Sequence, residues 1–181
     1  MRDRRSPLVE FTDYYFLVHP MATVKLVPND CPKGVSVPVE VALMFRVYKD
    51  IAEMYEDPGN LLQMVLSEVS KDSLEKAIEF ATYHLANPDV VVPPNTEDAY
   101  MDWDNLSPWD KATFCGELTD PEAWIPLVAC ANYLGYDEMI HVTCKRLGFL
   151  IADRDIEEIK RIFRVQEADA AAHEPKRART N

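Results

Sequence analysis

Two side chains in the second half of the chain have the chemistry and the spacing of metal ligands. His141 and Cys144 stand three positions apart in a stretch with helical periodicity, so both could face one ion. A structural zinc site needs four ligands, and neither two more ligands nor a known motif accompanies this pair. We therefore expect both to be buried or partly buried structural residues, and we predict no metal site.

Four aspartates form a second candidate, because their carboxylates could gather a cation: Asp98, Asp102, Asp104 and Asp110. They lack the regular loop spacing and the glycine of a calcium-binding loop. The surrounding stretch, residues 87–107, is rich in prolines and acids. That composition is typical of an acidic linker in solvent, which is the interpretation we favour.

The motifs of several enzyme classes are missing. The chain has five glycines, with no phosphate-binding loop and no dinucleotide fingerprint. The G-x-S-x-G motif of the α/β-hydrolases is also missing. We therefore predict no catalytic residue, no cofactor and a non-enzymatic role.

The composition limits the classes of molecule that this protein is expected to bind. The chain has 181 residues, 48% of them hydrophobic, which suffices for one domain with a core. Its net charge of −12 argues against nucleic acid and membrane surfaces as partners and is compatible with a basic protein. The four cysteines show no close pairing and no apolar run approaches the length of a membrane span. We expect a soluble intracellular protein with reduced thiols.

The hydrophobic pattern of the first half predicts strands followed by helices. Thr23–Val27 and Val35–Pro38 are expected strands. Phe45–Tyr55 and Ser73–Leu85 are expected helices, the second capped by Ser70 or Asp72. The fold class is therefore α+β.

Three amphipathic helices are predicted in the second half. In the first, Leu127, Ala131 and Leu134 form an apolar stripe, Asn132 and Tyr133 fall off it, and Gly135 ends the helix. The second and third repeat the pattern from Met139 and from Ile156. Together they have more apolar surface than one small core needs.

Four motifs in this half are similar to a known family. They are Trp109-Asp110, Ala131–Leu134, Val142–Lys145 and Glu157–Lys160, and they stand in matching order and spacing. In these residues the chain resembles the Skp adaptors of SCF (Skp–cullin–F-box) ubiquitin ligases. The resemblance spans roughly Thr23 to Val165. It implies a BTB/POZ-type fold, short strands plus helices, followed by a carboxy-terminal helical Skp segment. It also implies that Met64–Leu66 is the short third strand.

The resemblance also implies two binding surfaces. Asn132 and Tyr133 match the family pair that faces the cullin scaffold, although a helix-end Asn and a half-buried Tyr would look the same in sequence. Five apolar residues match the surface that receives the F-box: Ile140, Leu147, Ile151, Ile159 and Phe163. Some of these five must be core, and the sequence does not divide them.

The resemblance divides the chain into four parts. Residues 1–22 are an amino-terminal extension, and 23–104 a BTB/POZ-like portion with the acidic linker. Residues 105–165 are the helical portion that binds the F-box and the cullin, and 166–181 a disordered tail. The expected role is an adaptor that links F-box substrate receptors to a cullin–RING scaffold for ubiquitin-dependent protein degradation. The alternative is a self-assembling BTB-type protein that has lost F-box clamping and forms a homodimer through its BTB-like portion.

Two features depart from the family. Pro126 falls inside the helix that carries Asn132, and it is tolerated if that helix starts near Trp124. After Val165 the chain lacks the acidic helix, with a Trp near its end, that helps clamp the F-box, so we expect weaker F-box binding. The tail instead contains the basic run Pro175–Arg179, which resembles a nuclear signal. We expect protein in both cytoplasm and nucleus.

Overall fold

The computed structural model describes residues 22–54, 61–93, 103–116, 121–152 and 154–163. Several expectations fall outside these residues. They concern the extension up to residue 21, the aspartates Asp98 and Asp102, and the tail 166–181.

Three strands make one small sheet. The middle strand, β1 (Thr23–Pro28), is antiparallel to β2 (Val35–Pro38) and parallel to β3 (Gln63–Leu66). Gly34, in the turn between β1 and β2, has a φ of 68°, a conformation that favours glycine. Buried and exposed residues alternate along β3, as in a sheet with one covered face. The three predicted strands are confirmed, β1 and β3 each being one residue longer.

Two short helices follow β2: α2 (Val39–Ala42) and α3 (Arg46–Ala52). The predicted helix Phe45–Tyr55 is thus shorter in the structure. Phe45 has an extended backbone, with φ −89° and ψ 113°, and its side chain is fully buried, so α3 begins one residue later. Residue 55 lies outside the described part of the chain.

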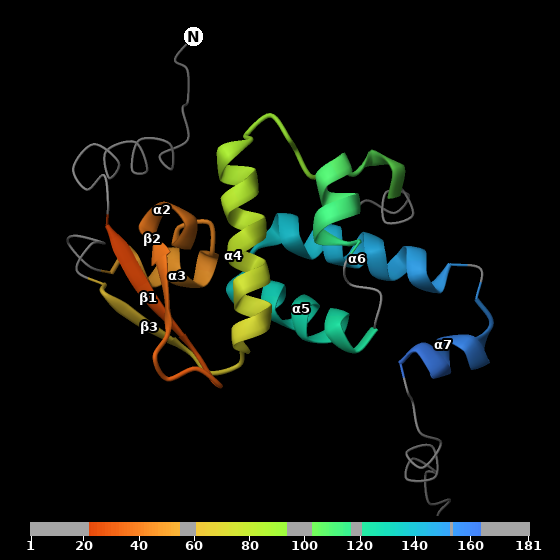
Figure 1. Cartoon of the computed structure of the whole chain (residues 1–181), viewed down its shortest axis with the longest axis horizontal. Helices are drawn as coiled ribbons and strands as arrows, with labels where there is room; N and C mark the ends of the chain where they lie inside the picture. The colour runs from red at the N-terminus through yellow and green to blue at the C-terminus, as the bar shows by residue number, and fades with distance from the viewer. Residues whose placement is uncertain (1–21, 55–60, 94–102, 117–120, 153, 164–181) are drawn as a thin grey trace, which may run out of the picture.

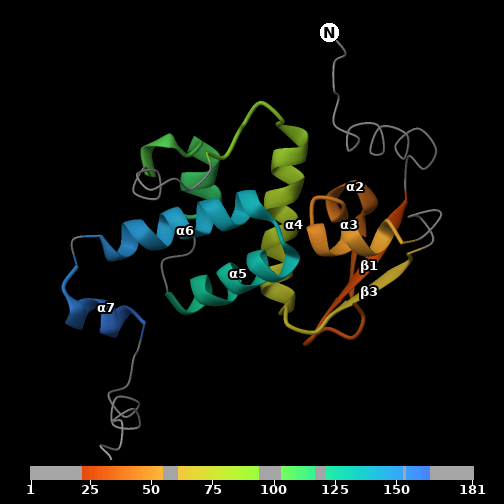
Figure 2. The same cartoon turned by 180° about the vertical axis from the view of Figure 1, so that it is seen from behind.

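The long helix α4 (Lys71–Ala86) is the middle layer of the molecule. Its cap is Ser70, whose hydroxyl accepts a hydrogen bond from the backbone N–H of Ser73 at 3.4 Å. Figures 1 and 2 both show the sheet on one side of α4 and two later helices on the other. Both faces of α4 are therefore covered.

The second half is helical, with the short turns η3 (Trp103–Asn105) and η4 (Asp110–Phe114) before α5 (Pro121–Leu134), α6 (Asp137–Ile151) and α7 (Ile156–Ile162). α5 and α6 lie side by side, and α7 lies beyond the far end of α6 (Figures 1 and 2). Gly135 ends α5 with a φ of 65°, as predicted. None of the described helices is long and apolar enough to cross a membrane. The α+β class is confirmed.

One hydrophobic core runs through both halves, and Phe80 of α4 joins them. Its ring lies 4.8 Å from that of Phe114, 5.5 Å from Tyr136 and 6.2 Å from Trp109, measured between centroids. Phe45, which follows α2, meets Tyr136 edge-on at 5.8 Å. Aromatic pairs at these separations add to the free energy of apolar burial. The sheet half and the helical half therefore pack as one body.

The Trp-Asp motif anchors the start of the helical half to α4. The ring of Trp109 stacks on Tyr83, with centroids 3.8 Å apart and an interplanar angle of 4°. Asp110 is buried, with Oδ1 3.0 Å from Nε2 of His84 and Oδ2 accepting a 2.8 Å hydrogen bond from the hydroxyl of Ser107. Buried charge needs such partners. The motif therefore has a structural role, because it fixes the start of the helical half against α4.

Pro126 lies deeper in its helix than the sequence suggested. α5 begins at Pro121 and not near Trp124, so Pro126 follows the first turn. Proline suits the first position of a helix, where its missing N–H would be unpaired in any case. Farther along, Pro126 cannot donate to the carbonyl four residues earlier and crowds that turn. The condition under which Pro126 would be tolerated, a helix start near Trp124, is therefore not met.

The change Pro126→Ala should therefore stabilise the protein. Pro126 is exposed, so the change removes little packing while restoring one backbone hydrogen bond. We expect the free energy of unfolding, measured by urea titration, to rise by about 1–3 kcal/mol with an unchanged m value. A free energy that stays constant or falls would contradict this description of α5.

Candidate partner-binding site

An apolar groove of about 360 Å³ lies between α5 and α6. It is lined by Trp124, Ile125, Val128, Ala129 and Asn132 of α5 and by Leu147 of α6. We call this feature the α5–α6 groove. Its volume is at the lower end of the range of protein pockets that hold small ligands or single large side chains.

The groove exists because α5 has two apolar faces. The predicted stripe of Leu127, Ala131 and Leu134 is at most 2% exposed and faces the core. The second face carries Ile125, Val128, Ala129 and Asn132, which recur at steps of three or four residues. Ile125 is 49% exposed. α5 therefore presents one apolar face to the core and another to solvent.

The structure separates the two residues predicted to meet a cullin. Asn132 is exposed and lines the α5–α6 groove. Tyr133 is half-buried and packs against the core. Successive side chains on a helix point in different directions, so neighbours in sequence need not share a surface. The expectation that both are exposed together is wrong for Tyr133.

The structure also divides the five residues predicted to receive an F-box. Leu147 lines the α5–α6 groove, whereas Ile140 packs against the core. Ile151, Ile159 and Phe163 are half-buried and lie outside the lining of the groove. Leu147 is the one of the five that the structure brings together with Asn132.

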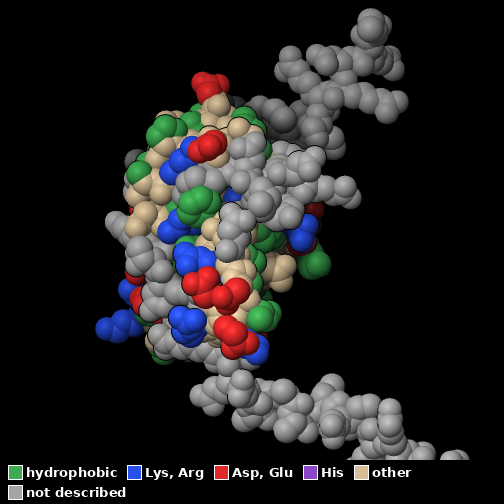
Figure 3. Space-filling model, turned by 90° about the vertical axis from the view of Figure 1, so that its right-hand side faces the viewer, with side chains coloured by type: hydrophobic (Ala, Val, Ile, Leu, Met, Phe, Trp, Pro, Cys, Tyr) green, Lys and Arg blue, Asp and Glu red, His purple; other side chains and the backbone are tan. Residues whose placement is uncertain are grey.

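Two further apolar side chains, one on α6 and one on α7, are exposed outside the lining of the groove. Phe149 of α6 is 51% exposed and Ile156 of α7 is 64% exposed. Figure 3 faces this side of the molecule and shows acidic and basic side chains gathered over its lower part, with hydrophobic side chains among and above them. Two of the charged ones on α7, Glu157 and Lys160, form an exposed ion pair at 2.9 Å. This side combines uncovered apolar surface with charged groups at its margin.

Among the described residues, His141 and Cys144 belong to no cluster of three or more possible metal ligands. His141 and Cys144 are half-buried, as expected for structural residues. Burial, with Lys145 nearby, lowers the pKa of the His141 imidazole, and burial raises the pKa of the Cys144 thiol. A protonated thiol is a poor metal ligand. The described part of the chain contains no cluster of three or more His, Cys, Asp or Glu side chains suited to a metal ion.

The remaining thiols and aspartates have structural or solvent-exposed positions. All four cysteines are free thiols, as predicted, and burial raises the pKa of Cys115 and of Cys130 to about 12. Asp110 is already paired with His84, as described above, and the side chain of Asp104 is 99% exposed. These two aspartates therefore do not gather around one cation.

Sequence reasoning missed most of the groove. Trp124, Ile125 and Ala129 line it, but none was a predicted site residue. A signal was present, because Ile125, Ala129 and Asn132 recur at helical spacing. The stripe through Leu127 had the same period, and the sequence alone did not show that α5 would have two apolar faces.

Several proteins of known role are similar to this chain. SCF ubiquitin ligase complex protein SKP1a of Dictyostelium discoideum is 29% identical over 147 residues, which are 81% of this chain and 85% of the relative. SKP1-like protein 18 of Arabidopsis thaliana is 30% identical over 121 residues, 67% of this chain and 72% of the relative. E3 ubiquitin ligase complex SCF subunit sconC of Aspergillus flavus is 27% identical over 135 residues, which are 74% of this chain and 80% of the relative. No protein-family model matches the chain.

An α+β fold with a helical second half, together with these relatives, defines the class of protein. The chain belongs to the Skp1 family of SCF ubiquitin ligase subunits, as a divergent member. The resemblance predicted from its four motifs is confirmed.

Proposed function

We propose that this chain is a non-enzymatic adaptor that links F-box substrate receptors to a cullin–RING scaffold for ubiquitin-dependent protein degradation. The printed names of its relatives describe SCF ligase subunits, which supports this role. The same names give no support to the alternative of a self-assembling BTB-type protein. The chemistry of ubiquitin transfer would reside in other subunits.

The observation that carries the proposal is the apolar surface of α5, α6 and α7. The α5–α6 groove, with Ile125, Phe149 and Ile156 about half exposed or more, leaves large side chains in water. An amphipathic partner helix laid into such a groove is a common mode of recognition. Each large apolar side chain that becomes fully buried contributes about 1.5–3 kcal/mol.

Within this proposal the predicted residues have defined tasks. Leu147 and the α5 face would contact the F-box directly, and Ile151, Ile159 and Phe163 would extend that surface toward α7. Ile140 would support the groove from the core side. Asn132 would contact the cullin at the exposed end of α5, with Tyr133 holding that end against the core.

The division of the chain into portions and its place in the cell are part of the same proposal. Residues 23–104 would form the BTB/POZ-like portion and residues 105–165 the portion that binds partners. The small sheet and the helices α2–α4 are compatible with the former. The protein would act in both the cytoplasm and the nucleus.

Filling the α5–α6 groove should weaken F-box binding. Ala129 is exposed and lines the groove, so Ala129→Arg places a long charged side chain there without opening a core cavity. We expect the affinity for a purified F-box domain, measured by calorimetry, to fall at least about tenfold, or 1.4 kcal/mol. Ala86→Arg is the matched control, because Ala86 is exposed on α4 and away from the groove. Equal affinities for both variants and the native protein would exclude the groove as the F-box site.

Cullin binding should depend on the exposed end of α5. Changing Asn132 and Tyr133 to Ala together should lower the affinity for a cullin amino-terminal domain at least about tenfold. Because Tyr133 packs against the core, the single change Asn132→Ala isolates the surface contribution and should leave the free energy of unfolding unchanged. Unchanged cullin affinity in a folded double variant would refute this assignment. A loss of F-box affinity alone would assign Asn132 to F-box binding instead.

A further inference from the structure

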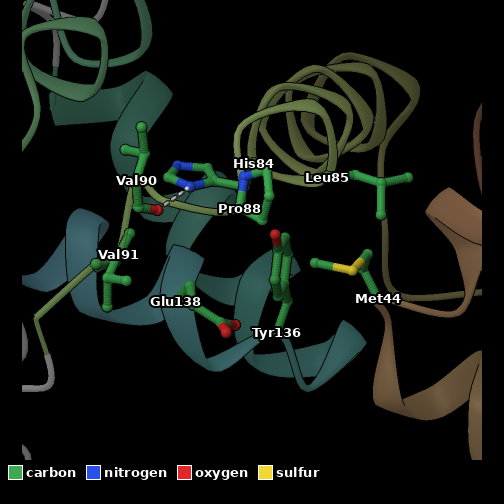
Figure 4. Close-up of a pocket in the computed structure, with 9 residues that line it drawn as sticks. Met44, His84, Leu85, Pro88, Val90, Val91, Tyr136 and Glu138 are labelled. Atoms are coloured by element: carbon green, nitrogen blue, oxygen red, sulfur yellow. Dashed lines mark hydrogen bonds between the residues drawn. The ribbon is translucent and has the colours of Figure 1, made fainter. Parts of the chain in front are cut away.

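A second hollow of about 300 Å³ lies on another part of the molecule. It is formed by the end of α4, the segment that follows it and the start of α6, with Met44 at one side (Figure 4). It shares no lining residue with the α5–α6 groove. Its walls are mostly apolar, including Met44, Leu85 and Val91. It is therefore independent of the surface on which the proposed function rests.

A buried hydroxyl without a partner lies at this hollow. Tyr136 is 1% exposed, and its hydroxyl makes no hydrogen bond to any described residue. Figure 4 shows the hydroxyl pointing toward Pro88 and the end of α4, with Met44 beside it. Burial, with the charges of Glu138 and Asp110, raises the pKa of this phenol, so at neutral pH it is an uncharged group that can donate and accept. Leaving such a group unpaired is unfavourable.

Tyr136 cannot turn away to find a partner in solvent. Its backbone N–H is bonded to the carbonyl of Ala131 at 3.0 Å, directly after the left-handed Gly135. Its ring packs edge-on against Phe45 and Phe80, with centroids 5.8 and 5.5 Å away. The hydroxyl is therefore fixed in place, and a hydrogen-bonding group has to come to it.

The polar groups of the hollow limit what that group can be. Both ring nitrogens of His84 are already occupied, Nδ1 by the carbonyl of Val90 at 3.1 Å and Nε2 by Asp110 at 3.0 Å. The carboxylate in the lining is that of Glu138, exposed in the first turn of α6. A carboxylate at the exposed side, in a protein with net charge −12, favours a cation there. The apolar lining favours an uncharged body for the rest of the ligand.

We propose that this hollow binds a small organic amine with a compact apolar or aromatic body and a hydroxyl or carbonyl group at the end opposite its ammonium group. The ammonium group pairs with Glu138, and the opposite end exchanges a hydrogen bond with the Tyr136 hydroxyl. The ligand reaches that hydroxyl when Met44 changes rotamer, which its unbranched side chain allows without movement of the backbone. Leu85, 36% exposed, can also move aside.

Three probes of equal body size test each end separately. Tyramine has both ends, phenethylamine lacks the hydroxyl, and 4-hydroxyphenylacetate replaces the ammonium by a carboxylate. Affinities for the full chain are measured by NMR chemical-shift titration. We expect tyramine to bind about five- to tenfold more tightly than phenethylamine, the value of one hydrogen bond, and at least tenfold more tightly than 4-hydroxyphenylacetate.

The variants assign each preference to a residue. Tyr136→Phe should abolish the preference for tyramine over phenethylamine, and Glu138→Gln should abolish the preference for the ammonium. Asp137→Asn is the matched control for charge, because Asp137 is exposed beside Glu138 but does not line the hollow. Ala129→Arg, in the α5–α6 groove, should change neither ratio.

The thermal stability of the unliganded protein is the second quantity to measure. Tyr136→Phe removes a buried hydroxyl that has no partner among the described residues, so the Tm of this variant should be unchanged or higher than that of the native protein. A Tm lowered by several degrees would show that the hydroxyl is already satisfied inside the fold, and would overturn the proposal. So would equal affinities of the three probes, or a tyramine preference that survives Tyr136→Phe.

Discussion

The aromatic packing around Phe80 is the constraint on which the rest of the structure depends. Its neighbours come from separate parts of the chain: Phe114 from η4, Tyr136 from the α5–α6 turn and Trp109 from the segment before η4. Phe45 is joined to the cluster through Tyr136. Because α4 is covered on both faces, the sheet and the α5–α6 pair have fixed positions on either side of it. The α5–α6 groove inherits its geometry from this arrangement.

That core covers only part of the helical half. The apolar residues of α5 that face α4 are buried, whereas Ile125 and Ala129 on the other face are exposed. The second half of α6 and all of α7 extend beyond α4, and they also expose apolar side chains. Large contiguous apolar surface is typical of interaction sites. In the proposed adaptor role, a partner would cover these side chains.

Local sequence signals predicted much of the fold. Alternating valines predicted the strand Val35–Pro38, and Gly135 predicted a helix end. Ser70 was one of two predicted caps of α4, and the structure shows it in that position. Each of these signals acts through the backbone of its own neighbourhood. Features that depend on which helix or strand packs against a residue were harder to predict from the sequence. The burial of Tyr133 and the pairing of Asp110 with His84 require knowledge of which helix lies opposite, and periodicity does not contain it. For the same reason, the sequence did not predict that α5 would have two apolar faces.

The most direct test of the central claim is hydrogen–deuterium exchange of the full chain with and without a purified F-box domain. Amides of α7 and of the second half of α6 are not covered by α4, so they should exchange quickly in the free protein. The account predicts that F-box binding slows exchange there and along the outer face of α5, while β1–β3 remain unchanged. Protection confined to the sheet, or no protection in α6 and α7 when the complex has formed, would contradict it.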